Sequence, residues 1–313
     1  MFDIVEMGED EDAVGGGEGF GEDNPYGWGV LIRNAHHVRV ADTTISDMAV
    51  GGIASVESSH LDIVGNEVYD NAYWGTEQGS GISLWHSVDS GLGPGADGYH
   101  DRIVGNRIHG NENRVYSRWH PDRQTITDGN GIIIDQTNQT GYTGRILVAN
   151  NVIFDNGGRA VLVLDAARVD IMFNTAYHNG RTPELEGGPV EMAASRAQSV
   201  RVFNNLIWGR PGVPPFAVDK SAEVEMGGNL LVTDTRRGPA TELDLVVVDD
   251  PGLVAPGLDP AAVDFRPRPD SAAVGRSMAT DPRVPVDIDG RARPVGAGTP
   301  GAYEPGVGTS STD

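Results

Sequence analysis

The chain has no cysteine among its 313 residues, which excludes disulfide bonds and thiolate-bound metal sites. It has a single lysine, Lys220. No apolar run approaches the roughly 20 residues that a membrane-spanning helix needs, so we expect no membrane partner. The first 25 residues also lack the basic start and the apolar core of a signal peptide.

Basic residues are scarce as well, since 23 Lys and Arg stand against 45 Asp and Glu and give a net charge of −22. Such a surface stays soluble and repels polyanions, so we expect no nucleic-acid partner. The acidic bias is typical of a halophilic or high-GC source. Glycine and proline are plentiful instead, with 43 and 19 residues, and this suits a chain with many tight turns.

A nine-residue phrase recurs five times. Its copies are IVGNEVYDN at 63–71, IVGNRIHGN at 103–111, VANNVIFDN at 148–156, IMFNTAYHN at 171–179 and RVFNNLIWG at 201–209. Each copy follows another short run of alternating apolar residues, such as GISLWHS (81–87), GIIIDQT (131–137) and AVLVLDA (160–166). An apolar period of two with many β-branched residues predicts strands, here two per repeat, and argues against helical repeats.

Repeats of this size cannot bury their own apolar rows, so they must stack on their neighbours as the coils of a solenoid. One asparagine of each phrase would then lie above the next at an inward turn and bond to it at the strand spacing of about 4.8 Å. The predicted ladder consists of Asn66, Asn106, Asn151, Asn174 and Asn204. A second column, five residues later in each copy, consists of Asn71, Asn111, Asn156 and Asn179.

These repeats resemble those of the right-handed parallel β-helix proteins with pectate-lyase-like repeats, a carbohydrate-active family. The resemblance covers roughly residues 26–235 and implies an all-β, right-handed parallel β-helix solenoid of about seven coils with inserted loops. It also implies a secreted or cell-surface protein, and we expect a monomer. Lyases, glycosidases, epimerases and phage tailspikes share this scaffold, so the fold alone does not fix the reaction.

The flanking segments differ from the repeats. We expect residues 1–25 to be an acidic N-terminal segment, either a truncated first coil or a cap, because a solenoid needs its end covered. A truncated start would also account for the missing signal peptide. Residues 236–305 are rich in Pro, Gly and Asp and predict a C-terminal capping segment, followed by a disordered tail over 306–313.

Three inserted segments mark the expected working face. The ladder asparagines are spaced by 40, 45, 23 and 30 residues, so the longer repeats carry extra loops, at about 87–101, 112–127 and 180–188. Loops that project from one side of a solenoid are where binding sites are usually built. We therefore place a substrate groove across the strands at 81–87, 131–137 and 160–166.

The second insert belongs to a basic island over residues 100–123, with arginines at positions 102, 107, 114, 118 and 123. Aromatic rings lie among them, which suits an acidic sugar: rings stack on pyranose faces and arginine binds a carboxylate in bidentate fashion. Alternatively, the arginines pair with the acidic bulk of the protein and Trp119 packs on the flank of the solenoid. The candidate substrate-binding residues are Trp74, Glu77, Trp85, Arg114, Tyr116, Arg118, Trp119, His120 and Arg123.

Alternation along the three groove strands turns Trp85, Asp135 and Leu164 outward, followed at the bend by His86, Gln136 and Asp165. Arg159 lies at the turn before the third of these strands. The candidate catalytic residues are Arg159, His86, Asp135 and Asp165.

Oxygen ligands cluster in TDGNGIIID (127–135), where Asp128, Asn130 and Asp135 could hold Ca²⁺, a cation that takes six to eight of them. The alternative is that Asp and Asn beside Gly form ordinary turns.

The leading functional hypothesis is a lyase that cleaves an acidic, uronic-acid-containing polysaccharide by β-elimination. Arg159 or His86 would remove the proton next to the carboxylate, and Ca²⁺ or arginine would stabilise the enolate-like state. Many lyases of the resembled families use a catalytic lysine, whereas Lys220 lies several coils away from the inserts.

Two alternatives remain open. One is a glycoside hydrolase with paired carboxylates drawn from Glu77, Asp128, Asp135 and Asp165, because adjacent coils can provide the separations that inverting or retaining enzymes need. The other is a glycan-binding surface protein without catalysis, favoured by an aromatic groove that lacks convergent titratable groups.

Overall fold

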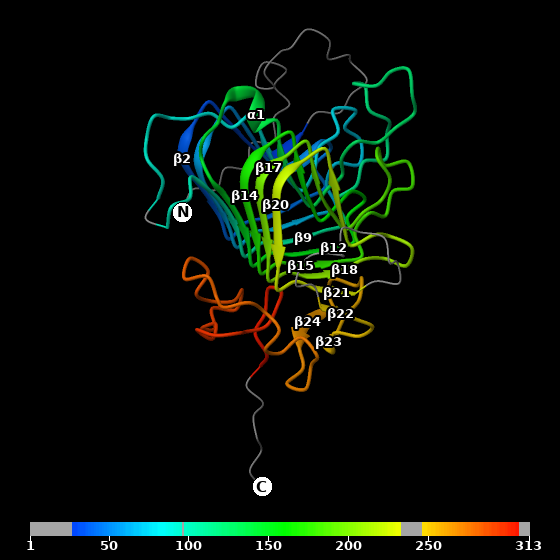
Figure 1. Cartoon of the computed structure of the whole chain (residues 1–313). Helices are drawn as coiled ribbons and strands as arrows, with labels where there is room; N and C mark the ends of the chain where they lie inside the picture. Colours follow the sequence, from blue (N-terminus) through cyan, green and yellow to red (C-terminus); the bar gives the residue numbers. More distant parts are fainter. Residues whose placement is uncertain (1–26, 96, 233–245, 307–313) are drawn as a thin grey trace.

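A computed structural model describes residues 27–95, 97–232 and 246–306 and shows a parallel β-helix (Figure 1). The expected N-terminal segment 1–25 and, except for residue 306, the expected tail 306–313 lie outside the described residues. From Trp28 to Val232 every third strand along the chain pairs in parallel within the same sheet, so each coil contributes one strand to each of three sheets. Seven coils are present in the described part of the chain, and the predicted fold class is therefore confirmed.

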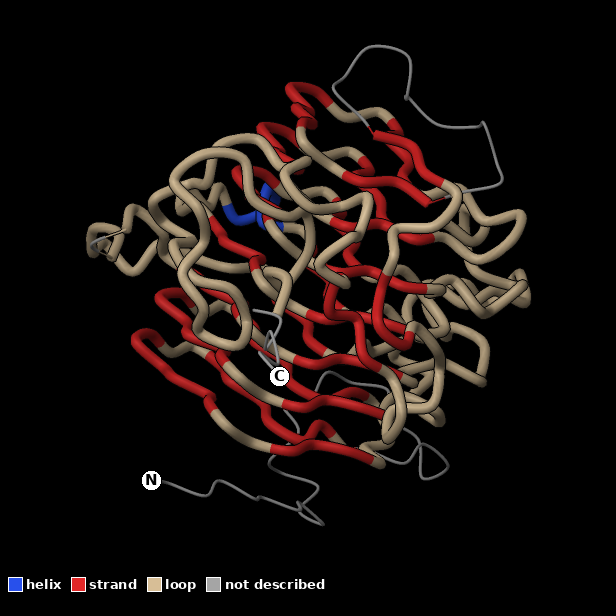
Figure 2. The backbone as a smooth tube through the Cα atoms, turned by 90° about the horizontal axis from the view of Figure 1, so that it is seen from below, coloured by secondary structure: helices blue, strands red, loops and turns tan. Residues whose placement is uncertain are grey.

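The three sheets run the length of the solenoid, with the strands of successive coils side by side (Figure 2). Sheet A comprises β1 (Trp28–Arg33), β4 (Gly51–Val56), β7 (Ile82–Trp85), β10 (Ile132–Asp135), β13 (Val161–Leu164), β16 (Met192–Ser195) and β19 (Phe216–Asp219). Sheet B comprises β2 (His36–Ala41), β5 (Ser59–Val64), β8 (Asp101–Val104), β11 (Ile146–Ala149), β14 (Ala167–Met172), β17 (Gln198–Phe203) and β20 (Ala222–Gly227). Sheet C comprises β3 (Thr44–Ser46), β6 (Glu67–Tyr69), β9 (Arg107–His109), β12 (Val152–Phe154), β15 (Thr175–Tyr177), β18 (Leu206–Trp208), β21 (Leu230–Val232) and β22 (Val246–Val248).

Each coil has three strands, so the prediction of two per repeat was wrong. The nine-residue phrase is broken at its centre, between sheets B and C, by a residue in the left-handed region directly before the ladder asparagine. These corner residues are Gly65, Gly105, Asn150, Phe173, Asn204 and Gly228, with φ between 54° and 69°. Glycine and asparagine adopt this conformation most readily, and a single such residue is enough to turn the strand.

The first asparagine ladder is present, with one correction to its members. In each rung the backbone N–H and the Nδ2 amide donate to Oδ1 of the next coil, as from Asn151 to Asn174 at 3.0 and 2.9 Å. The predicted Asn204 takes the left-handed corner instead, and Asn205 forms the rung. The ladder continues to Asn229.

The second ladder has the predicted members, and a carboxyl ends it. Glu191 is fully buried and accepts from the Asn179 backbone N–H at 2.8 Å and from its Nδ2 at 2.5 Å. In the next coil the residue equivalent to Asn179 is Arg210. Its guanidinium donates to Asp155 and does not continue the ladder. Burial raises the pKa of Glu191 to about 8, against the opposing effect of the two bonds from Asn179.

The core is a continuous column of apolar side chains that point inward from all three sheets, mostly Ile, Val, Leu and Ala. The C-terminal segment, which includes the antiparallel pair β23 (Leu253–Ala255) and β24 (Asp264–Pro267), lies along the outer face of sheet C (Figure 1). Phe265 packs there on Phe154 and Tyr177, with ring centroids 5.4 and 5.1 Å apart. Sheet C is therefore covered by this segment. The three inserts border sheet A, because each connects a sheet A strand to a neighbouring sheet.

The only helix in the described residues is the single turn α1 (Thr137–Thr140). No helix in this part of the chain is both long and apolar enough to cross a bilayer.

Replacing Asn151 by Leu should lower the free energy of unfolding by about 1 to 3 kcal/mol, because two donors of Asn106 would lose their acceptor in a buried site. Chemical denaturation of the full chain measures this. Asn138→Leu, at an exposed position, is the control and should change stability by no more than about 0.5 kcal/mol. Equal stability of both variants would contradict the role of the ladder.

Replacing Glu191 by Gln should flatten the dependence of stability on pH. The folded pKa of Glu191, about 8, lies above its ordinary value of 4.5, so its contribution is fully present below pH 4.5 and is lost as the pH rises through 8. The difference in unfolding free energy between the parent and Glu191→Gln should therefore change steadily between pH 5 and 8. A constant difference would show that Glu191 does not take up a proton on folding.

Candidate active site

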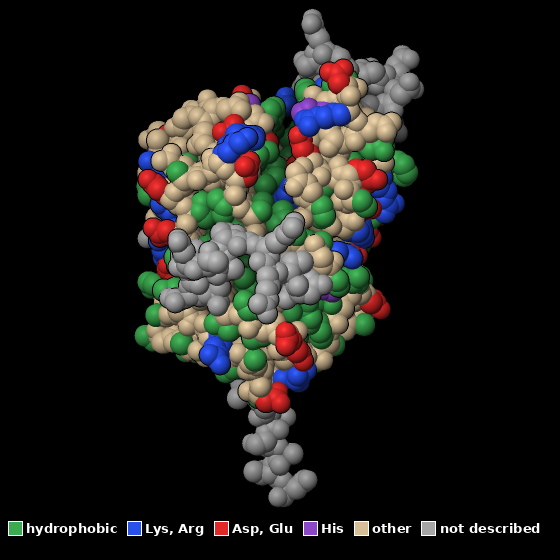
Figure 3. Space-filling view, turned by 45° about the vertical axis from the view of Figure 1, so that its right-hand side comes forward, with side chains coloured by type: hydrophobic (Ala, Val, Ile, Leu, Met, Phe, Trp, Pro, Cys, Tyr) green, Lys and Arg blue, Asp and Glu red, His purple; other side chains and the backbone are tan. Residues whose placement is uncertain are grey.

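The molecule is hollowed between two rims, with hydrophobic side chains at the base of the hollow (Figure 3). Sheet A forms the floor, and we call this feature the sheet A groove. One rim combines the inserts 112–127 and 180–188, which meet at a bridge between Ile126 and Leu185. The other combines the insert 87–101 with α1, where Thr140 Oγ1 donates to the Ser87 carbonyl at 2.5 Å.

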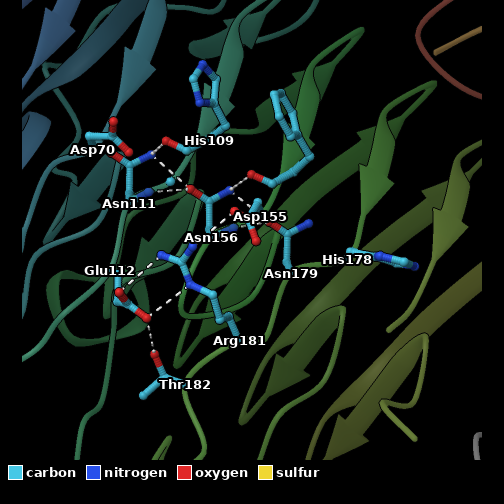
Figure 4. A network of polar contacts seen from close by, with 12 residues as sticks. Asp70, His109, Asn111, Glu112, Asp155, Asn156, His178, Asn179, Arg181 and Thr182 are labelled. Atoms are coloured by element: carbon cyan, nitrogen blue, oxygen red, sulfur yellow. Dashed lines mark hydrogen bonds and ion pairs between the residues drawn. The ribbon is translucent and has the colours of Figure 1, made fainter. Parts of the chain in front are cut away.

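The base of the 180–188 insert is held by a charged network at the corner between sheets C and A. Arg181 bonds to Glu112 and Asp155, at 3.1 and 3.0 Å, and Thr182 donates to Glu112 at 3.3 Å. Figure 4 shows Glu112 directed at Arg181 and Thr182, beside the Asn111, Asn156 and Asn179 rungs. The insert rim is thus fastened to the ladder that orders the coils.

The groove floor follows the predicted alternation. Leu84, Ile134 and Val163 are fully buried in the core, while the residues beside them point outward. Trp85, Asp135 and Leu164 are direct partners on adjacent strands of sheet A. Of these three, Trp85 is 39% exposed.

The residue after each of these strands adopts the left-handed conformation, with φ of 53° at His86, 56° at Gln136 and 49° at Asp165. This shared conformation sets the three side chains in a row along the edge of the floor. His86 stacks on Trp85 with ring centroids 4.3 Å apart, and its Nε2 lies 3.0 Å from Gln136 Oε1. Gln136 Nε2 in turn donates to Asp135 Oδ2 at 3.3 Å.

Asp135 is the most conspicuous titratable group on the floor. Its Oδ1 is buried and has no hydrogen-bond partner among the described residues. Burial and then the negative charge of Asp165 raise the pKa of Asp135 to about 7. At neutral pH this carboxyl is therefore poised between its acid and its base form.

Asp128 lies close enough to Asp135 for their charges to interact. Burial and then the charge of Asp135 raise the pKa of Asp128 to about 8, although Arg159 opposes the shift. Asp128 Oδ1 accepts from Asn130 Nδ2 at 3.0 Å, and Oδ2 accepts from Thr127 Oγ1 at 3.4 Å. Asp128, Asp135 and Asp165 thus form a group of interacting carboxyls at the floor.

Arg159, a predicted base or clamp, is only 7% exposed. Its Nη2 donates to the backbone carbonyls of Glu186 and Gly188, at 2.6 and 3.3 Å, and so ties the 180–188 insert to the floor. Burial lowers the pKa of this guanidinium, while Asp128 and Glu186 raise it. Its position suits a structural cation better than a group that meets substrate.

The calcium hypothesis does not fit the donor set. Asn130 is fully buried, and its Oδ1 accepts a hydrogen bond from the Arg159 backbone N–H at 2.9 Å. Its Nδ2 donates to Ser80 Oγ and to Asp128 Oδ1. It therefore has no oxygen directed at a cation beside Asp128. Among the described residues, no group of three or more His, Asp or Glu side chains is arranged to hold a metal.

All five arginines of the basic island are paired with carboxylates. The pairs are Arg102 with Asp97, Arg107 with Glu67, Arg114 with Glu112, Arg118 with Glu77 and Arg123 with Glu186, at 2.6 to 3.3 Å. His120 also faces Glu186, at 3.4 Å. Four of the five partners lie outside the island itself, so the sequence did not reveal how completely its charge is balanced.

The aromatic candidates are exposed around the insert rim. Trp74, Tyr116 and Trp119 are 55%, 44% and 60% exposed, and Trp119 Nε1 donates to the Glu77 carbonyl at 3.2 Å. Gln136 was not among the candidate site residues, although it contacts Asp135 directly. Its position after GIIID, equivalent to His86 and Asp165 in their repeats, was the available signal.

Comparison with known proteins adds little to this picture. No family model matches the chain, and neither does any curated protein. A solved structure described as "The complex structure of XylC with xylose" aligns with a TM-score of 0.41 and 13% identity, over 86% of this chain and 50% of that one. The chain thus spans half the length of that protein, and the assignment to the parallel β-helix fold rests on the strand order described above.

Proposed function

We propose that this protein is a glycoside hydrolase that cleaves an uncharged glycan in the sheet A groove. The observation that carries the proposal is Asp135, whose unpartnered Oδ1 lies on the floor beside a second carboxyl on the next coil. Glycoside hydrolysis requires such a pair, with one member kept protonated at neutral pH.

In this mechanism Asp135 is the general acid. It donates its proton to the glycosidic oxygen as the bond to the sugar carbon breaks, and positive charge develops on the sugar ring. The carboxylate of Asp165 stabilises that charge, and either it or a water that it activates attacks the sugar carbon. Gln136 donates to Oδ2 of Asp135, so we assign the proton to Oδ1, the buried oxygen that has no hydrogen-bond partner among the described residues.

Elimination is less well supported than hydrolysis. A lyase needs an accessible base and a cation that binds the uronate carboxylate. The guanidinium of Arg159 is buried and donates to a backbone carbonyl, and Arg114, Arg118 and Arg123 form salt bridges with glutamates. Three carboxyls, those of Asp128, Asp135 and Asp165, lie at the floor and would repel a uronate, and the single charge of Arg196 opposes them only in part. This distribution of charge favours a substrate without carboxylates.

A panel of neutral glycans, pectate, alginate and glycosaminoglycans tests the reaction class. We expect new reducing ends from a neutral glycan without the ultraviolet absorbance of an unsaturated uronate. Asp135→Asn should lower kcat by about 10²- to 10⁴-fold, because it removes the acid. Asp270→Asn, an exposed position on the C-terminal segment, is the control and should leave the rate unchanged. Absorbance at the uronate band would establish a lyase, and binding without any cleavage would establish a glycan-binding protein.

The pH profile provides an independent check on the acid. Because Asp135 must be protonated and its pKa is about 7, kcat/KM should fall as the pH rises above 7. Asp165→Asn should lower the rate, because it removes the second carboxylate, and it should move the alkaline limb of the residual activity to lower pH, since it removes a negative charge that raises the pKa of Asp135. An alkaline limb that Asp165→Asn leaves in place would argue against Asp135 as the acid.

A further inference from the structure

We propose that Trp85 is a stacking platform for the sugar unit adjacent to the cleaved bond, and that it selects sugars whose ring hydroxyls are equatorial. The inference rests on the proposed function, because it takes Asp135 as the position of the cleaved bond. It adds a binding subsite and a substrate class, namely gluco- and xylo-configured glycans.

The spacing of the coils supports this assignment. Trp85 and Asp135 are direct partners on adjacent strands, and such strands lie about 4.8 Å apart. That spacing is close to the length of one sugar ring. A glycan that crosses the strands along the solenoid axis would therefore place one sugar over Trp85 when the next linkage lies at Asp135.

The Trp85 ring is held in place before any sugar binds. His86 stacks on it at 4.3 Å with an interplanar angle of 22°, and the His86 ring is itself tied to Gln136 at 3.0 Å. Little side-chain freedom would be lost on binding, which favours affinity. The same contacts lead through Gln136 to Asp135, so the platform and the acid are positioned by one set of side chains.

The chemistry of the platform defines the class of sugar. An indole ring offers a broad apolar face and no charge, so it binds a sugar through a face made of C–H groups. Equatorial hydroxyls leave the axial C–H groups on both faces of a pyranose, as in glucose and xylose. An axial hydroxyl, as at C4 of galactose, interrupts one of those faces, and the selection that we propose assigns that face to the contact with the indole.

The test uses the full chain carrying Asp135→Asn, so that binding is measured without turnover. Gluco-, xylo- and galacto-configured β-1,4-linked tetrasaccharides are titrated by calorimetry, and tryptophan fluorescence is recorded. We expect the first two to bind more tightly than the third. Trp85→Ala should weaken their binding about tenfold and abolish the preference, Trp85→Phe should weaken it less, and Leu258→Ala on the C-terminal segment should have no effect.

Trp85→Phe keeps an aromatic ring and remains informative if Trp85→Ala misfolds. Equal affinities with and without Trp85, or failure of every tetrasaccharide to bind, would overturn the platform. Hydrolysis by the parent chain is scored separately from reducing ends. Cleavage without a role for Trp85 would refute only this inference, whereas Trp85-dependent binding without cleavage would support the platform and refute the proposed hydrolase.

Discussion

The fold depends on the hydrogen bonds between asparagines of successive coils. Each rung donates a backbone N–H and an amide N–H to one oxygen of the next coil, so the polar groups at two inward corners are satisfied without water. A buried amide left without its partner would cost more than the bond contributes, which fixes the register of every coil. Glu191 can end one ladder because the last rung needs only an acceptor.

This fixed register also creates the candidate site. The chain turns each corner with a residue in the left-handed conformation, and at the edge of sheet A these residues are His86, Gln136 and Asp165. Repeated backbone geometry brings side chains that are about 30 to 50 residues apart into one row, where Gln136 contacts both His86 and Asp135. The scaffold alone can therefore place the carboxyls of the candidate site to within a strand spacing of one another. The inserts add only the rims.

The sequence predicted the features that the repeats determine, namely the coils and the ladders. It did not predict the contacts between side chains of different coils. Phrase periodicity predicted seven coils and both ladders, but it could not distinguish Asn204 from Asn205, because both residues are asparagines and only the corner conformation separates their roles. The basic island seemed available for an acidic ligand because its partners, such as Glu186, lie far away in the chain. Gln136 was not selected as a site residue, because the sequence does not show that its amide contacts both His86 and Asp135.

The contrast between two carboxyls explains how an acidic protein can keep one of them protonated. Asp170 is fully buried beneath Arg145 and Arg201 and accepts from Tyr99 Oη at 2.7 Å, so positive charge balances it. Asp135 accepts a hydrogen bond from the amide of Gln136 and faces the negative charge of Asp165, while Arg196 has a smaller, opposing effect. Because no cation pairs with Asp135 directly, the cost of burying its charge is relieved by binding a proton, which raises its pKa. Among the described residues no ion pair forms at Asp135, and this lack of a paired cation is the condition that favours its protonated form.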